Sequence, residues 1–241
     1  MIAGVDLIRA VSFDLWFTLI WETKEDEEIY VGMRVRAIKD FLNSLGYDIE
    51  EGVIREAYAA TKDFRMLMPA KDLLSMILMS LGMSLDDLDA LVRAYEESTD
   101  GFTPRLNQEA PEVLRELKRR GMKLALVTNT SFSTRSIRGI LKNVGLDLFD
   151  VIISSSDIGS VKPQVEIFRT LKSELGLDGD QIIHVGDSCY QDVIGAMRSG
   201  LKAVHYTKLA DLRGSKVNCG NLPRIESLWQ LLEIVEANNP L

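Results

Sequence analysis

The sequence predicts an α/β protein whose doubly wound parallel sheet is interrupted by an inserted all-helical domain. From about residue 108 onward, short apolar segments alternate with amphipathic helical segments, which is the βαβ succession of a parallel sheet. Between residues 22 and 103, apolar residues recur only at helical spacing. A continuous apolar strand, residues 8–13, precedes this helical stretch. The insertion is therefore expected directly after the first strand of the sheet.

Composition bounds the class of protein. The chain has 241 residues, 46% of them hydrophobic, which suits one large core with an insertion. Its 28 basic residues against 36 acidic ones give a net charge of -8, without a basic cluster that would neutralise a phosphate backbone. No apolar run approaches the roughly 18 residues that a membrane span requires. We therefore expect a small-molecule partner rather than nucleic acid or a membrane, and a monomer or small homo-oligomer.

The two cysteines, Cys189 and Cys219, show neither metal-ligand spacing nor the pattern of a disulfide framework. Such usage is typical of a reducing compartment. The first residues also lack a basic region followed by a long apolar run. The sequence therefore predicts unpaired cysteines and a cytoplasmic location.

The inserted domain is expected to be entirely helical. Helical spacing recurs over residues 22–45, 51–66 and 70–81. A fourth helix is predicted to open at Ser84, where Asp87 follows three residues later. The predicted division is a core formed by residues 1–21 and 104–241 and a helical domain formed by residues 22–103.

The core segments follow in regular alternation. Strands are predicted over residues 122–127, 151–154, 181–185 and 203–206. Helices are predicted over residues 111–120, 133–144, 191–199 and 227–236, with one more opened by Pro163. Right-handed crossovers then place the strands parallel in one Rossmann-like sheet.

Polar residues with useful chemistry follow the apolar strands. Asp14 comes directly after the first strand, Thr128 ends the second, and Lys162 lies in the loop after the third. The fourth strand leads into Asp187 and Asp192. Each residue alone is ordinary, because Asp and Thr are common in turns and Lys is commonly a solvated charge. Together they are expected to converge, because parallel strands present their carboxyl ends at one edge of the sheet.

These residues resemble the haloacid dehalogenase superfamily. Its four loops match, in order and approximate spacing, Asp14 with Thr18, then Thr128, then Lys162, then Asp187 with Asp192. The resemblance covers the predicted core. It implies that the helical insertion is that family's small α-helical (C1-type) cap, which sets the choice of substrate.

The chemistry implied by the resemblance begins with Asp14, which would attack phosphorus in line and form an aspartyl-phosphate that water later hydrolyses. Mg²⁺ prefers hard oxygen ligands. Three groups would supply these ligands: the carboxylates of Asp14 and Asp187 and the main-chain carbonyl of Trp16. Asp192 would not bind the metal directly but would support the residues that do.

The remaining candidates would bind the substrate. Lys162 would hold the phosphate oxygens and keep the nucleophile ionised, while Thr128 and the amide of Asn129 would donate hydrogen bonds to the transferring group. Trp16 and Thr18, in the loop after the nucleophile, complete the predicted substrate-binding set.

One position departs from the phosphatase pattern. Phosphatases of this superfamily usually carry a second Asp two residues after the nucleophile, as general acid and base, and Trp16 stands there. An aromatic residue at this place resembles the dehalogenase branch, whose Asp attacks a halogen-bearing carbon without metal. That branch lacks the Gly-Asp and following Asp of the fourth motif.

Asp187 and Asp192 therefore favour a Mg²⁺-dependent phosphatase, since paired carboxylates in one site are costly without a cation. By family resemblance its substrate is a small phosphorylated metabolite such as a sugar or triose phosphate. The alternatives are a 2-haloacid dehalogenase-like hydrolase and a catalytically weak protein that binds or senses a phosphate ligand.

Other polar residues receive simpler interpretations. His184 and His205 lie within predicted strands and are interpreted as core histidines. Lys24, Lys62 and Arg65 are candidates for contacts with the leaving group of the substrate, although most such charges solvate a helix face.

Overall fold

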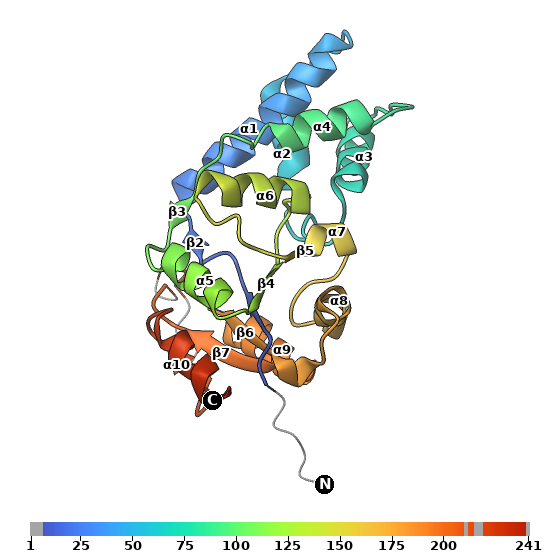
Figure 1. Cartoon of the computed structure of the whole chain (residues 1–241). Helices are drawn as coiled ribbons and strands as arrows, with labels where there is room; N and C mark the ends of the chain where they lie inside the picture. Colours follow the sequence, from blue (N-terminus) through green and yellow to red (C-terminus); the bar gives the residue numbers. More distant parts are fainter. Residues whose placement is uncertain (1–6, 210–211, 215–218, 240–241) are drawn as a thin grey trace.

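The computed structural model describes residues 7–209, 212–214 and 219–239 (Figure 1). Its main sheet has six strands in the order β5-β4-β1-β6-β7-β8, and every neighbouring pair is parallel. The strands are β1 (Ala10–Phe13), β4 (Lys123–Thr128), β5 (Val151–Ser154), β6 (Ile182–Gly186), β7 (Lys202–Tyr206) and β8 (Arg224–Ile225). The predicted α/β fold with a parallel sheet is confirmed.

The first strand of the sheet, β1, is central because it lies between β4 and β6. Phe13 pairs in register with Leu126 on one side and with Val185 on the other. Val11 and Phe13 join the apolar cluster on one face, whereas Ala10 joins the cluster on the opposite face. Since β1 is covered on both faces, its sequence is an uninterrupted apolar run rather than an alternating one.

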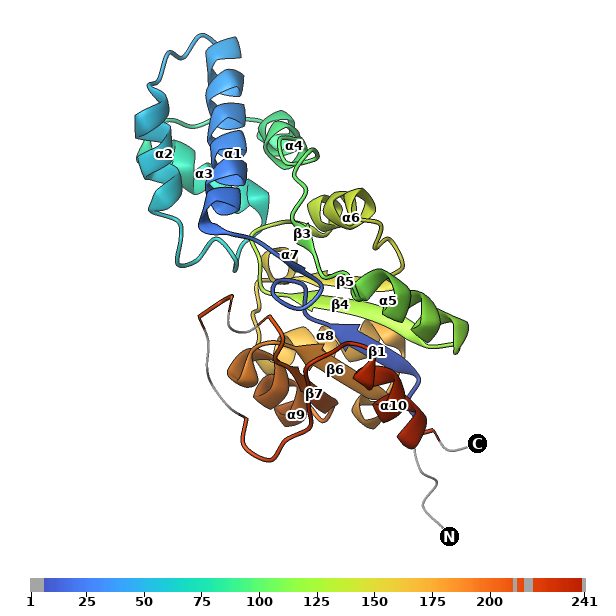
Figure 2. The ribbon, with the colours of Figure 1, turned by 90° about the vertical axis from the view of Figure 1, so that its left-hand side faces the viewer.

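Helices cover both faces of the sheet, as a doubly wound fold requires (Figure 2). One apolar cluster contains α5 (Ala110–Arg119), α6 (Thr134–Asn143) and α10 (Gln230–Ala237). The other contains α8 (Val165–Leu175) and α9 (Gly195–Arg198). A short helix, α7 (Ser155–Ile158), follows β5 directly, and a 3-10 turn, η1 (Gly179–Gln181), precedes β6.

The helical insertion forms a separate group of helices beside the sheet (Figure 1). Its helices are α1 (Lys24–Ser44), α2 (Glu51–Ala59), α3 (Ala70–Ser80) and α4 (Asp89–Glu97). They bury an apolar cluster of their own, centred on side chains such as Val35, Leu74 and Tyr95. Within the described part of the chain, no helix combines the length and the apolar character needed to cross a bilayer. The domain limits of residues 22 and 103 stay a prediction.

Two helices of the insertion differ from their predicted limits. The helix predicted to reach residue 66 ends at Ala59, because the chain turns where the Thr61 hydroxyl donates to the Tyr58 carbonyl at 2.7 Å. The helix predicted to open at Ser84 begins at Asp89, whose main-chain N–H donates to the Asp87 carboxylate at 2.8 Å.

Two helix starts in the core were also wrong. The helix after the Lys162–Pro163 bond, which is cis, begins at Val165 rather than at the proline. The segment predicted as one helix over 191–199 begins earlier, as a π-helix, η2 (Cys189–Ile194), and continues as α9. The antiparallel pair β2 (Ile20–Trp21) and β3 (Arg105–Leu106), which joins core and insertion, was not predicted, nor were β8 and α7.

The cysteine prediction was wrong. Cys189 and Cys219 form a disulfide across a sequence separation of 30 residues. Cys189 begins η2 after β6, and Cys219 precedes β8, so the bond links η2 to the segment before β8. The spacing of the two residues could not reveal this pairing, because it depends on how the loops meet. The cysteines therefore give no support for a reducing compartment.

Candidate active site

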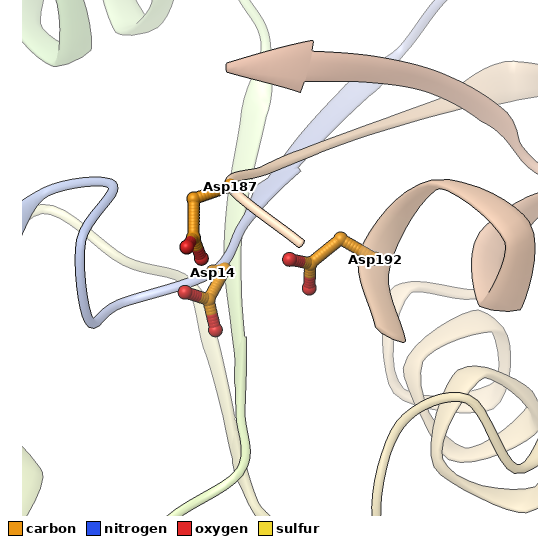
Figure 3. A group of neighbouring side chains, drawn as sticks. All are labelled: Asp14, Asp187 and Asp192. Carbon is orange, nitrogen blue, oxygen red and sulfur yellow. The ribbon is translucent and has the colours of Figure 1, made fainter. Parts of the chain in front are cut away.

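Three carboxylates meet at the carboxyl edge of the sheet (Figure 3). Asp14 follows β1, Asp187 follows β6, and Asp192 lies in η2. Each offers an oxygen within 4.8 Å of the others, and all three residues are buried. The structure thus brings together the acidic residues that the sequence analysis selected.

Lys162 joins this group from the loop before α8. Its ammonium donates to Asp14 Oδ1 at 2.5 Å and to Asp192 Oδ1 at 2.6 Å, and the residue is 2% exposed. Burial opposes its positive charge, but the two carboxylates outweigh burial and raise the pKa of Lys162. The lysine is therefore a fixed buried cation next to the predicted nucleophile.

Asn129 fixes the backbone of this lysine. Its side-chain amide donates to the Lys162 carbonyl at 2.9 Å, and its side-chain oxygen accepts from the Lys162 N–H at 2.8 Å. The side chain of Asn129 is thus engaged in positioning Lys162, and the predicted donation from its amide to the substrate stays a prediction. Asn129 also lines the cavity described below.

Asp192 is surrounded by donors. Besides Lys162, it contacts His184 Nε2 at 3.3 Å through Oδ1 and accepts the Ser188 N–H at 2.8 Å through Oδ2. Burial opposes its ionisation, but Lys162 and His184 hold the pKa of Asp192 well below its usual range. A side chain at Gly186 would lie 2.2 Å from the Asp192 carboxyl carbon, so this contact requires glycine. Asp192 is consequently a permanently ionised support for the lysine.

His184 has a role in the site that was not predicted from the sequence. Its Nδ1 lies 2.7 Å from the Ser12 hydroxyl, and Ser12 and His184 are register partners on β1 and β6. Burial lowers the pKa of His184, so the ring is neutral near pH 7 and connects Asp192 to the central strand. Ser12 and His184 are polar residues within apolar strands, and this was the feature of the sequence that could have indicated their contact.

The negative charges of Asp14 and Asp187 are less well compensated than that of Asp192. Burial raises the pKa of Asp14 to about 6, with added repulsion from Asp192 and Asp187 against the attraction of Lys162. Burial also raises the pKa of Asp187, although Arg213 opposes the shift. The site therefore holds more negative charge than Lys162 neutralises.

Two hydroxyl groups lie at the same edge. The Thr128 hydroxyl is buried and has no hydrogen-bond partner among the described residues. The Thr18 hydroxyl is 3.5 Å from Asp14 Oδ2, at the long limit of a hydrogen bond. An unpaired buried hydroxyl at a strand end is a donor available to a ligand.

A cavity of about 230 Å³ opens from Asp14 toward the helical insertion. Trp16, Tyr30 and Phe132 give it an aromatic wall, and Lys62 and Arg65 line it from the turn after α2. The cavity is lined by residues Asp14, Trp16, Phe17, Glu22, Glu27, Tyr30, Lys62, Arg65, Met66, Asn129, Thr130, Ser131, Phe132, Gln191 and Arg213. Lys24, the third predicted cation, is exposed and is not part of this lining.

The donor set fits a hard divalent cation. The three carboxylates provide only oxygen ligands, which Mg²⁺ and Ca²⁺ prefer over nitrogen or sulfur. Burial, with added repulsion from Asp192, raises the pKa values of Asp14 and Asp187, and a bound cation would favour their ionised forms. Trp16, whose carbonyl is the third predicted ligand, lies in the loop next to Asp14.

Known proteins match both the sequence and the fold. The family model of haloacid dehalogenase-like hydrolases matches residues 56–206. The chain is 31% identical over 236 residues to phosphatase MT3486 of Mycobacterium tuberculosis, covering 94% of this chain and 97% of that protein. It is 38% identical over 93 residues to (S)-2-haloacid dehalogenase of Pseudomonas sp. strain YL, covering 38% and 39%.

The chain spans 39% to 59% of the length of several curated relatives that it matches. Among solved structures, 2-haloacid dehalogenase of Pseudomonas syringae pv. Tomato DC3000 has a TM-score of 0.65 at 22% identity, covering 97% of this chain and 100% of that one. This likeness is one of fold. The family model and the full-length match together show that the chain belongs to the haloacid dehalogenase-like hydrolases.

Proposed function

We propose that this hydrolase is a Mg²⁺-dependent phosphatase of small phosphorylated metabolites, such as sugar or triose phosphates. One observation carries the proposal: three buried carboxylates lie within 4.8 Å of one another around one buried lysine. Displacement at a carbon atom needs only one carboxylate nucleophile. The additional carboxylates are explained by a bound cation, because like charges in one buried site are otherwise costly.

Asp14 is the proposed nucleophile. A pKa of about 6 leaves its carboxylate mostly ionised at pH 7, and the contact with Lys162 fixes Oδ1. Attack of a carboxylate oxygen on phosphorus would expel the alcohol and leave an acyl phosphate on Asp14, which water then hydrolyses. Mg²⁺ held by Asp14, Asp187 and the Trp16 carbonyl would supply positive charge to the phosphoryl oxygens.

The chain also offers groups for the transferred phosphoryl group. Lys162 provides a charge beside Asp14, and the Thr128 hydroxyl, unpaired among the residues that the structure describes, provides a neutral donor. Such preorganised donors stabilise negative charge without reorganising during the reaction. Thr18, next to Asp14, would orient the nucleophile.

The far side of the cavity favours a small, charged leaving group. Lys62 and Arg65 line it from the helical insertion, opposite Asp14. A cavity of about 230 Å³ admits a metabolite rather than a polymer. We therefore propose that the helices over residues 22–103 act as a cap that selects the substrate. A cytoplasmic location and a monomeric or small homo-oligomeric state remain predictions.

Dehalogenation is the second candidate, and a specific contact favours it. Arg213 and Lys162 each engage a carboxylate of the acidic group, so the site is partly neutralised by protein cations. Trp16 also gives the cavity an aromatic wall suited to an apolar haloacid. A third possibility is a weak enzyme that mainly binds a phosphate ligand, because no carboxylate stands at position 16.

Turnover in the presence and absence of metal separates these functions. The test supplies an aryl phosphate to the full chain with Mg²⁺ or with a chelator, and supplies 2-haloacids in parallel. Mg²⁺-dependent release of phosphate supports the proposal. Halide release that resists the chelator would instead establish the dehalogenase, and stoichiometric phosphate binding without turnover would establish a binding protein. Asp14→Asn is the matched control, since it removes the nucleophile in both enzymatic schemes.

A further inference from the structure

Arg213 is a second cation at the acidic site, and it reaches that site from a different loop. Its Nη1 donates to Asp187 Oδ1 at 3.0 Å and to Oδ2 at 3.1 Å. Its guanidinium also lies 5.6 Å from the Phe17 ring centroid, in the loop after Asp14. Arg213 thus satisfies the carboxylate proposed as a direct metal ligand.

Arg213 and Lys162 differ in how easily they can leave. The Lys162 side chain is 1% exposed and contacts two carboxylates, so it is part of the permanent site. The Arg213 side chain is 37% exposed and pairs with Asp187, whose own side chain is 0% exposed. Arg213 is therefore the more accessible of the two cations, and solvation of its guanidinium would lower the cost of leaving Asp187 when a metal ion takes its place.

The disulfide connects the two loops involved. Cys189 lies two residues after Asp187, and Cys219 lies six residues after Arg213. The covalent bond therefore links the chain segment that carries the arginine to the loop that carries its carboxylate partner. A short tether of this kind raises the effective concentration of one group at the other.

We propose that Arg213 competes with the divalent cation for Asp187, and that the Cys189–Cys219 disulfide sets how strongly it competes. This inference rests on the proposed function, because it concerns the same metal site. With the disulfide intact, Arg213 is held near Asp187 and metal affinity is low. With the disulfide reduced, the arginine is released more often and the site binds metal more tightly.

The redox step needs a reductant of the dithiol class. Two electrons and two protons pass from the dithiol to the sulfur–sulfur bond, which breaks into the thiols of Cys189 and Cys219. The dithiol closes to a cyclic disulfide. Both protein sulfurs end as thiols, so no further reactant is required.

Competition sets the size of the expected effect. When a metal ion must displace Arg213, its apparent affinity is the intrinsic affinity multiplied by the fraction of molecules in which the arginine does not occupy Asp187. A hydrogen-bonded pair of opposite charges, discounted for the exposure of Arg213, corresponds to roughly a tenfold change. Arg213→Gln should therefore tighten Mg²⁺ binding roughly tenfold. Loss of the disulfide should also tighten Mg²⁺ binding, by roughly threefold or more, because Arg213 is then no longer tethered near Asp187.

Calorimetric titration of the metal-free full chain with MgCl₂ tests the proposal without relying on activity. The samples are oxidised wild type, dithiol-treated wild type, Cys219→Ser and Arg213→Gln. Arg224→Gln is the matched control, because it removes an equal charge from an exposed ion pair with Glu226 outside the site. Thermal unfolding of each sample verifies that Cys219→Ser is folded, and dithiol-treated wild type gives the same comparison without a substitution.

The proposal expects tighter Mg²⁺ binding in reduced wild type, Cys219→Ser and Arg213→Gln, no change in Arg224→Gln, and no redox response in Arg213→Gln. Equal affinity of oxidised wild type and Arg213→Gln would overturn it. A redox response that persists in Arg213→Gln would also overturn it, because the disulfide would then act through another group. Failure of every sample to bind Mg²⁺ would overturn the proposed metal-dependent function as well, which separates the two ideas.

Discussion

Ionised Asp14 should cost the metal-free protein stability at neutral pH, and Asp14→Asn should remove that cost. Burial, reinforced by Asp192 and Asp187, raises the pKa of Asp14 from 3.8 to about 6 despite the attraction of Lys162. The folded state therefore binds a proton more readily than the unfolded state between about pH 4 and pH 6. Stability consequently falls as the pH rises through this window and stays lower above it.

The size of the effect follows from the shift. A rise from 3.8 to about 6 corresponds to roughly 3 kcal/mol, because each pKa unit is worth 1.36 kcal/mol. Asn at position 14 keeps the shape of the Asp side chain but cannot ionise. In a chelating buffer, the free energy of unfolding of Asp14→Asn should therefore exceed that of wild type by up to about 3 kcal/mol at pH 7, and by almost nothing at pH 4.

Urea denaturation at several pH values measures this difference. Asp150→Asn is a control of opposite sign: burial opposes ionisation of Asp150, but hydrogen bonds from Lys118 and the Leu124 N–H hold its pKa low. That substitution should destabilise the protein at pH 7. The reasoning is refuted if Asp14→Asn is no more stable than wild type at pH 7, or if its advantage does not shrink on acidification.

Three further predictions concern the substrate side of the site. Thr128→Val should weaken inhibition by inorganic phosphate roughly tenfold without loss of stability in urea, since it removes a buried hydroxyl that has no hydrogen-bond partner in the described part of the chain. Lys62→Met should raise the KM for a charged phosphate ester several-fold, whereas Lys24→Met, outside the cavity lining, should leave it unchanged. Wild type should release a burst of phenol from an activated aryl phosphate and then turn over slowly, because position 16 supplies no general base, a contribution worth roughly 10²–10⁴ in rate. A linear progress curve in stopped-flow would contradict this last expectation.

The acidic group could be predicted because it depends on topology. Asp14 and Asp187 each follow an apolar strand, and parallel strands meet at one sheet edge whatever their loops contain. Lys162 could be placed at this edge as well, because it lies in the loop that follows a parallel strand and precedes a helix. Its contact with Asp14 follows from strand order rather than from the details of side-chain packing.

The remaining parts of the site depend on loop geometry. Arg213 lies 26 residues after Asp187, and nothing in its local sequence indicates that it reaches the acidic site. Cys189 and Cys219 meet for a similar reason, since two loops separated by β7 happen to approach each other. A turn ends α2 where helical spacing continues, and that turn carries Lys62 and Arg65 into the cavity. Local patterns do not encode such approaches, because they are decided by tertiary packing.

The packing of Trp16 gives a physical reason for an aromatic residue where an acid would serve proton transfer. Its indole lies 6.0 Å from the Phe132 ring, which stacks on Phe102 and lies edge-on to Tyr30 of α1. The buried guanidinium of Arg34, also on α1, lies 4.0 Å from the Phe132 centroid and donates to the Ser131 hydroxyl at 2.9 Å. Aromatic and cation–π contacts therefore join the loop after Asp14 to the helical insertion.

A carboxylate at position 16 would lose the indole contact and place a charge beside these aromatic rings, at a desolvation cost. Trp16 thus links the helical insertion to the loop that carries Asp14, the proposed nucleophile, and under that proposal the proton chemistry comes from water or from another group.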